Sequence, residues 1–474
     1  MANLMMAGNP REQPRDLIPY FGYDNLMRPL GRVEIAGMDV LGDLGIISAE
    51  DYRLLTPEVR ENVLVISTTE VDRVEREITK HDVRAWTMLA KERLPEPLHR
   101  WVHVPYTSYD GLDTARIYMF LGAYHFVIVP KLKRTVRLLA DMADRFSGQV
   151  QIGRTHGQHA LPITVGFWLS TLLSRILYNW EEVDSKAEAL VAKISGAVGA
   201  YNAQVALGIE EKCGRKSFET RVLAKLGLEP ARISTQILPP EPLAYFLHSM
   251  LMLTGAFAQL GRDCRQLMRT EIAEVAEEFE QGQSGSSTMA HKRNPINFEK
   301  IEGTHLKTVA EYLKVLLTLI SEHQRDLVNS TVMRDFPVIP INLTVQLDTL
   351  LRENKQKVPF LQRITISPAM CERNFGLKRN VVLAEPLYIA LQMAGYKGDA
   401  HKLINEQAVP RAEAENRMLV DVLRSMSEQD SELAASFDQM PKDLIEQFRF
   451  PEKYIGKAVE KTREIVAIAN EQVA

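Results

Sequence analysis

Three segments of the sequence gather side chains that could hold an anion or move a proton. The first, QGQSGSSTMAHKRNPINFEK at 281–300, offers a hydroxyl, an ammonium and a carboxamide at Ser286, Lys292 and Asn294, close to two glycines. Glycine permits unusual backbone angles, and such polar groups together can stabilise a developing negative charge. A solvated surface linker of the same composition is the alternative.

The second segment, QIGRTHGQHALPITVG at 151–166, places His156 and His159 in an otherwise almost uncharged turn. Imidazole suits proton transfer because its pKa lies near neutral pH. The spacing could serve a metal, but no HExxH motif and no neighbouring carboxylate accompany it, so we expect no zinc. Two histidines that bind backbone carbonyls are the alternative.

The third segment, WVHVPYTSYDGLDTARIYMF at 101–120, places Thr107 and Ser108 directly before a helical pattern. Hydroxyls and free backbone N–H groups at the start of a helix can bind an anion. An ordinary helix cap has the same composition, so an anion site and a cap both remain open here.

Long helices must position these segments, because apolar residues recur at spacings of three and four along most of the chain. Strand patterns are scarce, and the apolar run at 62–67 is short. We therefore predict an all-α fold with four very long helices, at 112–146, 165–193, 242–280 and 298–322. Pro130 should kink the helix at 112–146.

Helix length and turn-rich stretches divide the chain into three predicted domains. Short helices fill 1–111, long helices form a central bundle at 112–355, and short helices return at 356–474. The glycine-rich stretch at 196–208 lacks a GxGxxG motif and a preceding strand, so we expect it to serve packing rather than dinucleotide binding.

Composition excludes several classes of function. The 474 residues carry a formal net charge of -4 without a block of like charge, so a basic nucleic-acid surface is not expected. The three cysteines are far apart and form no CxxC, which indicates a reducing cytoplasm. The N-terminus does not resemble a signal peptide and no long uncharged apolar window was found, so we expect a soluble cytoplasmic protein without a membrane partner.

Taken together, the motifs resemble the fumarase/aspartase superfamily. Its signature GSSxMPxKxNP is matched from Gly285 to Pro295, with Ala290 in place of the usual proline. The likeness is closest to the adenylosuccinate lyases of that superfamily. It rests on the KRNP form of the signature, His81-Asp82, RTHGQHA, the TSxD motif at 107–110, HxRDLxxSxxxR at 323–334 and a C-terminal module beginning ERNFGLKRN.

The resemblance implies a β-elimination that releases fumarate from a succinyl compound. By this likeness Ser286 is the catalytic base, and Lys292 and Asn294 bind the developing negative charge. His156 is the general acid, oriented by a carboxylate at Glu299.

The same resemblance implies the contacts with a small-molecule substrate. Thr107 and Ser108 would hold a carboxylate, and Arg325, Ser330 and Arg334 a phosphate. The other implied binding residues are His81, Asp82, Thr155 and Gln236.

The family resemblance also implies a homotetramer and no metal or organic cofactor. Members of the family form homotetramers with a twenty-helix core and active sites shared by three subunits, and we expect the same here. No metal and no organic cofactor is implied.

Departures from the family pattern leave the substrate open. Pro240, Gln324, Asn329 and Met333 stand where arginine, glutamate, histidine and glutamate are common, and the N-terminal nucleotide pocket has no clear match. Another fumarate-releasing C–N lyase, a 3-carboxy-cis,cis-muconate cycloisomerase and a non-catalytic structural relative are the alternatives.

Overall fold

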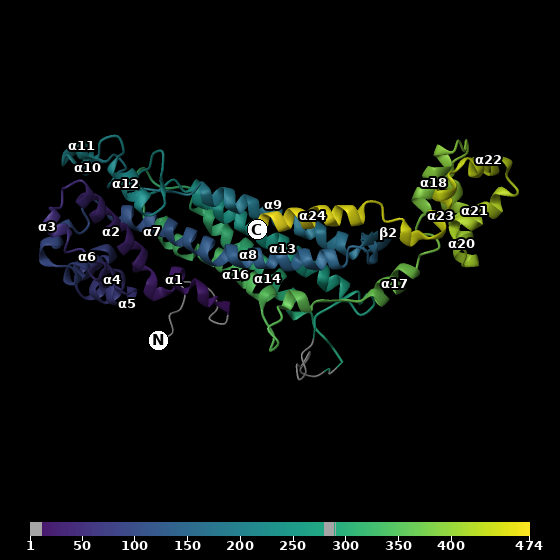
Figure 1. Cartoon of the computed structure of the whole chain (residues 1–474), viewed down its shortest axis with the longest axis horizontal. Coiled ribbons are helices and arrows are strands. Elements are labelled where there is room, and N and C mark those ends of the chain that lie inside the picture. Colours follow the sequence, from purple (N-terminus) through teal and green to yellow (C-terminus); the bar gives the residue numbers. More distant parts are fainter. Residues whose placement is uncertain (1–11, 279–288, 290) are drawn as a thin grey trace. The chain divides into compact units, whose positions relative to one another are not determined.

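The computed structural model describes residues 12–278, 289 and 291–474, and it is mostly helical (Figure 1). The prediction of a helical fold with long helices is confirmed. The named strands form three two-stranded sheets, which pair β1 (Val150–Thr155) with β2 (Gln158–Thr164), β3 (Val191–Ala192) with β4 (Glu229–Pro230), and β5 (Val275–Ala276) with β6 (Thr365–Ile366).

The chain folds into two compact units, each built from three stretches of sequence. Unit 1 comprises Met1–Lys133, Tyr178–Ala258 and Lys300–Leu351, and unit 2 comprises Arg134–Leu177, Gln259–Glu299 and Arg352–Ala474. Four long helices have residues in both units: α8 (Val129–Arg145), α9 (Val165–Glu188), α13 (Glu241–Leu267) and α14 (Ile296–Leu317).

Three of the four predicted long helices end earlier than the apolar pattern predicts, at Glu188, Leu267 and Leu317. α13 ends at Leu267 instead of continuing to 280. Beyond it, Ala273 has a φ of 54° and β5 pairs with β6. The interruption expected at Pro130 appears as a π-helical turn at Tyr124–Ile128, directly before α8. Such turns, like prolines, are recognised causes of helix kinks.

Unit 1 packs short helices around an aromatic core. The Phe21 and Phe120 rings lie 5.4 Å apart, and Tyr124 meets Phe246 edge to face at 5.6 Å. α2 lies beside both α4 and α7 (Figure 1). The helices wholly in unit 1 are α1 (Ile18–Phe21), α2 (Met27–Asp43), α3 (Ala49–Tyr52), α4 (Pro57–Leu64), α5 (Thr68–Val74), α6 (Asp82–Arg93), α7 (Ser108–Ala123), α10 (Asn202–Ala206), α11 (Ile209–Cys213), α12 (Phe218–Lys225), α15 (Val328–Val332) and α16 (Val338–Leu351).

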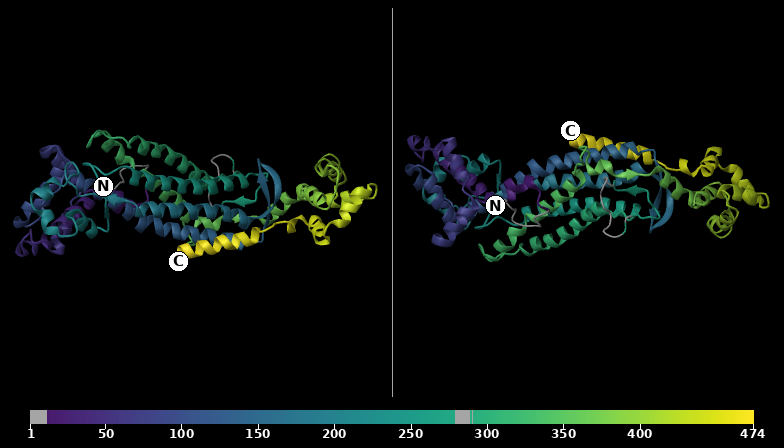
Figure 2. Two further views of the ribbon diagram at one scale, coloured as in Figure 1. Left: turned by 90° about the horizontal axis from the view of Figure 1, so that it is seen from above. Right: turned by 90° about the horizontal axis from the view of Figure 1, so that it is seen from below.

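Unit 2 carries the C-terminal helices, whose core includes the fully buried Leu391, Ile404 and Leu423. The last helix, α24, returns along the long helices (Figure 2). It contacts α8, where the Arg137 guanidinium donates to the carbonyl of Val473 at 3.3 Å. These helices are α17 (Pro368–Gly376), α18 (Ala384–Met393), α19 (Ala400–Lys402), α20 (Val409–Glu415), α21 (Leu419–Ser427), α22 (Ser431–Gln439), α23 (Lys442–Arg449) and α24 (Ala458–Val473).

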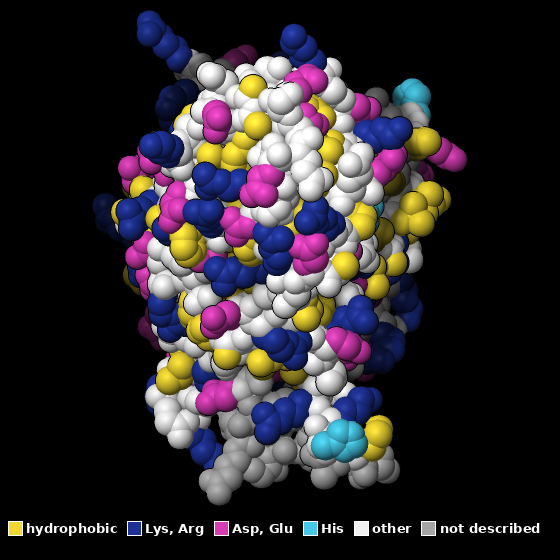
Figure 3. Space-filling view, turned by 90° about the vertical axis from the view of Figure 1, so that its right-hand side faces the viewer, with side chains coloured by type: hydrophobic (Ala, Val, Ile, Leu, Met, Phe, Trp, Pro, Cys, Tyr) yellow, Lys and Arg dark blue, Asp and Glu magenta, His cyan; other side chains and the backbone are white. Residues whose placement is uncertain are grey.

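One described helix, α13, is long and apolar enough to cross a membrane, but 72% of its most apolar window is buried, as in a core helix. On the face drawn in Figure 3, basic and acidic side chains are interspersed over the part that is described.

Candidate active site

The predicted site residues fall into two groups, each within one compact unit. Unit 1 carries His81, Asp82, Thr107, Ser108, Gln236, Arg325, Ser330 and Arg334, and unit 2 carries Thr155, His156, Lys292, Asn294 and Glu299. The predicted base, Ser286, lies outside the described residues.

The start of α7 presents Thr107 and Ser108. Thr107 is the N-cap residue and Ser108 begins the helix, and both side chains are half-buried. The backbone N–H of Thr107 donates to the Asp110 carboxylate at 2.9 Å. Thr107 and Asp110 therefore form a capping box, which is the ordinary helix cap given above as an alternative. The first-turn N–H groups that this box leaves unpaired can bind an anion.

Asp110 joins the start of α7 to the glycine-rich segment through an ion pair and hydrogen bonds. Its fully buried carboxylate pairs with the fully buried Lys193 ammonium and accepts the N–H groups of Ser195 at 3.0 Å and Gly196 at 3.1 Å. Gly196 has a φ of 83°, a backbone conformation that favours glycine. The glycine-rich stretch therefore packs against the helix start, as predicted.

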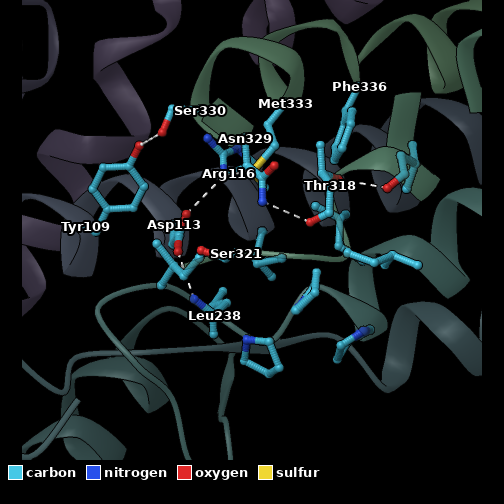
Figure 4. A pocket seen from close by; sticks show the side chains of 18 of the residues that line it. Tyr109, Asp113, Arg116, Leu238, Thr318, Ser321, Asn329, Ser330, Met333 and Phe336 are labelled. Carbon is cyan, nitrogen blue, oxygen red and sulfur yellow. Dashed lines mark hydrogen bonds and ion pairs between the residues drawn. The ribbon is translucent and has the colours of Figure 1, made fainter. Parts of the chain in front are cut away.

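Arg325, Ser330 and Gln236, which we call the anion seat, lie together beside Tyr109 of α7. The Arg325 guanidinium donates to the Gln236 side-chain oxygen at 2.8 Å and lies over the Tyr109 ring. The Tyr109 hydroxyl lies 2.5 Å from Ser330 Oγ (Figure 4). Since Tyr109 directly follows Ser108, the start of α7 and the anion seat are neighbours.

The charges of Arg334 and Asp82 both act on the Asp72 carboxyl. Burial raises the pKa of Asp72; the positive charge of Arg334 opposes this rise and the negative charge of Asp82 adds to it. His81 caps the N-terminus of α6, and its Nδ1 lies 3.3 Å from the Asp82 carboxylate. Both side chains reach solvent, so a ligand could contact them.

A cavity of about 80 Å³ adjoins the anion seat and has largely apolar walls, among them Pro240 and Met333. Inside it, the Asp113 carboxylate pairs with Arg116 at 2.9 Å and accepts the Leu238 N–H at 2.9 Å (Figure 4). Burial raises the pKa of Asp113, and the Arg116 charge opposes the rise. Pro240 and Met333, two of the departures from the family pattern, therefore line the cavity next to the anion seat.

A third departure, Asn329, also lines the cavity, and its side chain bonds to the backbone at the end of α14. Its amide donates to the carbonyls of Thr318 at 3.1 Å and Ile320 at 2.8 Å, directly after α14. It thereby satisfies carbonyls that the end of the helix leaves free.

In unit 2, Thr155 and His156 lie at the exposed turn of the β1–β2 hairpin, where His156 has a φ of 54°. The segment predicted as a loop is thus a hairpin that presents one imidazole to solvent. Burial and the Arg154 charge lower the pKa of the neighbouring His159.

A buried carboxylate anchors this hairpin. Glu274, which is fully buried, accepts the Arg154 guanidinium at 2.6 Å, the Gln151 amide at 2.7 Å and the Asn374 amide at 2.8 Å. The backbone around Thr155 and His156 is therefore tied to the segment that follows α13.

Lys292, Asn294 and Glu299 lie at and just before the start of α14. The buried Glu277 carboxylate accepts the N–H groups of Asn297 at 2.9 Å and Phe298 at 3.1 Å. Burial raises the pKa of Glu277, and these hydrogen bonds oppose the rise. Glu299 is exposed, and among the described residues no hydrogen bond joins it to His156.

Sequence reasoning missed Tyr109, Lys193 and Glu277. Tyr109 occupies the variable position of TSxD, and neither Lys193 nor Glu277 belongs to a motif with recognisable chemistry. Their partners are far away in sequence, so only the fold reveals them. Among the described residues no cluster of three histidine, cysteine or acidic side chains could hold a metal ion.

Comparison with known proteins places the chain in a family. Residues 58–309 match the family described as lyase. The chain belongs to this lyase family. It is 33% identical over 451 residues to the adenylosuccinate lyase of Pyrococcus horikoshii, with 94% of each chain covered, and 31% identical to that of Archaeoglobus fulgidus, with 94% and 95% covered.

Solved structures share the lyase's fold. It is similar to 3-carboxy-cis,cis-muconate lactonizing enzyme from Pseudomonas putida (22% identity, TM-score 0.78, 98% of each chain). It is also similar to fumarate lyase from Mesorhizobium sp. BNC1 (20% identity, TM-score 0.77, 97% and 100% covered). The resemblance to the fumarase/aspartase superfamily is confirmed, and the lyase is an enzyme that acts on a small-molecule substrate.

Proposed function

We propose that the lyase is an adenylosuccinate lyase of purine biosynthesis. It releases fumarate from adenylosuccinate, giving AMP, and from the succinocarboxamide ribotide SAICAR, giving AICAR. This makes it a carbon–nitrogen lyase of the amidine-lyase type. The observation that carries the proposal is the anion seat beside the start of α7, because the substrate needs one site for a carboxylate and another for a phosphate. The named relatives support it.

The chemistry requires a proton to leave a carbon next to a carboxylate. That carbon is weakly acidic because its deprotonation places a second negative charge on the carboxylate. Stabilising this dianion is the main task of the enzyme. We assign Lys292 and Asn294 to it, since both belong to the signature segment and can reach solvent.

Ser286 acts as the base that removes this proton, and His156 as the acid that protonates the departing nitrogen. The exposed position of His156 at the hairpin turn suits a group that must meet a substrate. Glu299 orients that imidazole. Thr107 and Ser108 hold a substrate carboxylate, Arg325, Ser330 and Arg334 hold the phosphate, and His81, Asp82, Thr155 and Gln236 complete the contacts.

The lyase assembles as a homotetramer whose active sites are shared between subunits. Four apolar side chains of α14 are exposed at alternating spacings of three and four, the period of a coiled-coil seam: Leu306, Val309, Leu313 and Leu316. A monomer would leave this stripe in water. The protein works in the cytoplasm, which accords with three free, buried cysteines.

A panel of substrates tests the proposal against its nearest rival. Purified protein is assayed with adenylosuccinate and with 3-carboxy-cis,cis-muconate, and fumarate and AMP are identified chromatographically. The apolar cavity lined by Pro240 and Met333 is the observation that favours a substrate without a nucleotide. Turnover of adenylosuccinate that is lost in the Arg325→Met variant would support a nucleotide substrate. Turnover of the muconate alone would refute the proposed function.

A further inference from the structure

We propose that Tyr109 is a positioning residue of the anion seat, holding Arg325 by its ring and Ser330 by its hydroxyl. The inference rests on the proposed function, because it concerns how the seat binds a substrate phosphate. Tyr109 itself need not touch the ligand.

The Arg325 guanidinium is held by neutral partners. Its carbon lies 3.5 Å from the centre of the Tyr109 ring, and its only hydrogen-bond acceptor among the described residues is Gln236. The buried Nε has no partner, and no described carboxylate lies within 4.0 Å of the guanidinium. A cation on an aromatic face and an amide oxygen keeps its charge available for an anion.

The buried acid Asp113 has a cationic partner other than Arg325. Burial raises the pKa of Asp113 and the charge of Arg325 opposes this rise, but the Asp113 carboxylate pairs with Arg116 at 2.9 Å. Among the residues that the structure describes, Arg325 therefore has no carboxylate partner of its own.

The Tyr109 hydroxyl fixes the second group of the seat. When it donates its proton to Ser330 Oγ across 2.5 Å, the Ser330 proton remains free to point at a phosphate oxygen. Hydrogen bonds in such a chain strengthen one another. Tyr109 is 8% exposed and anchored in α7, so both contacts come from a rigid element.

Two variants separate the ring from the hydroxyl. Tyr109→Phe keeps the ring under Arg325 and removes the bond to Ser330, whereas Tyr109→Leu removes both. Tyr118→Phe is a matched control, because Tyr118 lies on the same helix and has its own guanidinium, Arg32, at 5.9 Å. All four proteins are compared for thermal unfolding, for calorimetric binding of inorganic phosphate, and for kinetics with adenylosuccinate and with succinyladenosine, which lacks the phosphate.

We expect Tyr109→Phe to weaken phosphate binding about 5-fold and Tyr109→Leu about 20-fold. The KM for adenylosuccinate should rise by similar factors while kcat changes less than about twofold. Kinetics with succinyladenosine should stay within about twofold of wild type, since it makes no use of the seat. The control should match wild type in every assay.

Two results would overturn the inference. One is unchanged phosphate binding in a folded Tyr109→Leu protein, or in Tyr109→Phe if the leucine variant does not fold. The other is an equal loss with both substrates, which would indicate a general structural role. Phosphate binding that depends on Tyr109 without any cleavage of adenylosuccinate would support the seat and refute the proposed function separately.

Discussion

The buried pair of Asp110 and Lys193 supports the start of α7. Both side chains are fully buried, and the pair joins the helix start to the backbone at Ser195 and Gly196. Breaking such a pair from one side leaves an uncompensated charge in the interior, which costs about 3–5 kcal/mol.

We therefore expect Lys193→Met to lower the thermal unfolding midpoint by several degrees and to raise the KM for the substrate. The control is Lys461→Met, whose exposed ammonium pairs with Glu464 at the surface. Differential scanning calorimetry and steady-state kinetics measure both effects. An unchanged midpoint would show that Asp110 is held well enough by backbone N–H groups alone.

The His103–Glu34 pair predicts a dependence of stability on pH. Burial disfavours the His103 charge, but the hydrogen bond and charge of Glu34, 2.7 Å away, outweigh burial and raise the pKa of His103. A raised pKa means that folding favours the charged imidazole. The stabilisation is fully present below the ordinary value of 6.5 and is lost as pH rises through the higher, folded value.

The unfolding midpoint of the wild type should therefore fall between pH 6 and pH 8 by more than that of His103→Gln. Thermal unfolding at both pH values measures the difference. His401→Gln, an exposed histidine bound to Asn405, serves as the control. Equal pH dependence in wild type and His103→Gln would disprove the assignment.

At the scale of single residues, the sequence reveals motifs with known chemistry. It does not reveal the residues that hold those motifs in place. Thr107, Ser108, Arg325 and Ser330 belong to recognisable patterns, and the structure places them on neighbouring elements of unit 1. Tyr109 acts through partners more than a hundred residues away, and no local spacing encodes such a contact.

Among the elements, α14 depends on a carboxylate from outside the helix. Glu277 accepts the N–H groups of Asn297 and Phe298 in its first turn, and Arg352 holds the Asn297 side-chain oxygen at 2.7 Å. Lys292 and Asn294 lie directly before this turn, so their positions depend on it.

We predict that Glu277→Ala lowers kcat about tenfold or more, because loss of a helix cap costs about 1 kcal/mol and loosens the adjoining segment. Steady-state kinetics with adenylosuccinate measure it. The neighbouring exposed Glu278, which pairs with Arg363, provides the control variant Glu278→Ala. Equal kcat in both variants would count against a role for Glu277 in positioning Lys292 and Asn294.

Helices were easier to predict than their ends. Apolar periodicity identified α9, α13 and α14, but it continued past Leu267 because Ile272 and Val275 preserve the helical spacing while the chain leaves the helix. The β1–β2 hairpin was not predicted as strands, since its residues alternate poorly and its register shifts between Ile152 and Arg154.

At the scale of the whole molecule, the exposed stripe on α14 predicts assembly. Leu313, which is 58% exposed, should be buried in a helical interface, so Leu313→Glu should place a charge there. We expect light scattering to give the mass of four chains for wild type and a smaller mass for the variant, with activity lost in parallel.

Met393→Glu is the control, because Met393 is 85% exposed on α18 and outside this stripe. A tetramer that persists in Leu313→Glu would place the interface elsewhere. A fully active wild-type monomer would contradict shared active sites.

Fold class and family could be predicted from the whole sequence, since helical patterning and ordered motifs extend along nearly all of it. The sequence did not reveal how distant stretches join into the two compact units, because long helices such as α13 and α14 have residues in both units. The three-domain division remains a prediction.

The most direct test of the central claim is an absorbance assay of wild type and Ser286→Ala with adenylosuccinate, with products identified by chromatography. We predict stoichiometric fumarate and AMP from wild type and loss of turnover in the variant. No turnover by correctly assembled wild type, or undiminished turnover by Ser286→Ala, would contradict the proposed substrate or the proposed base, respectively.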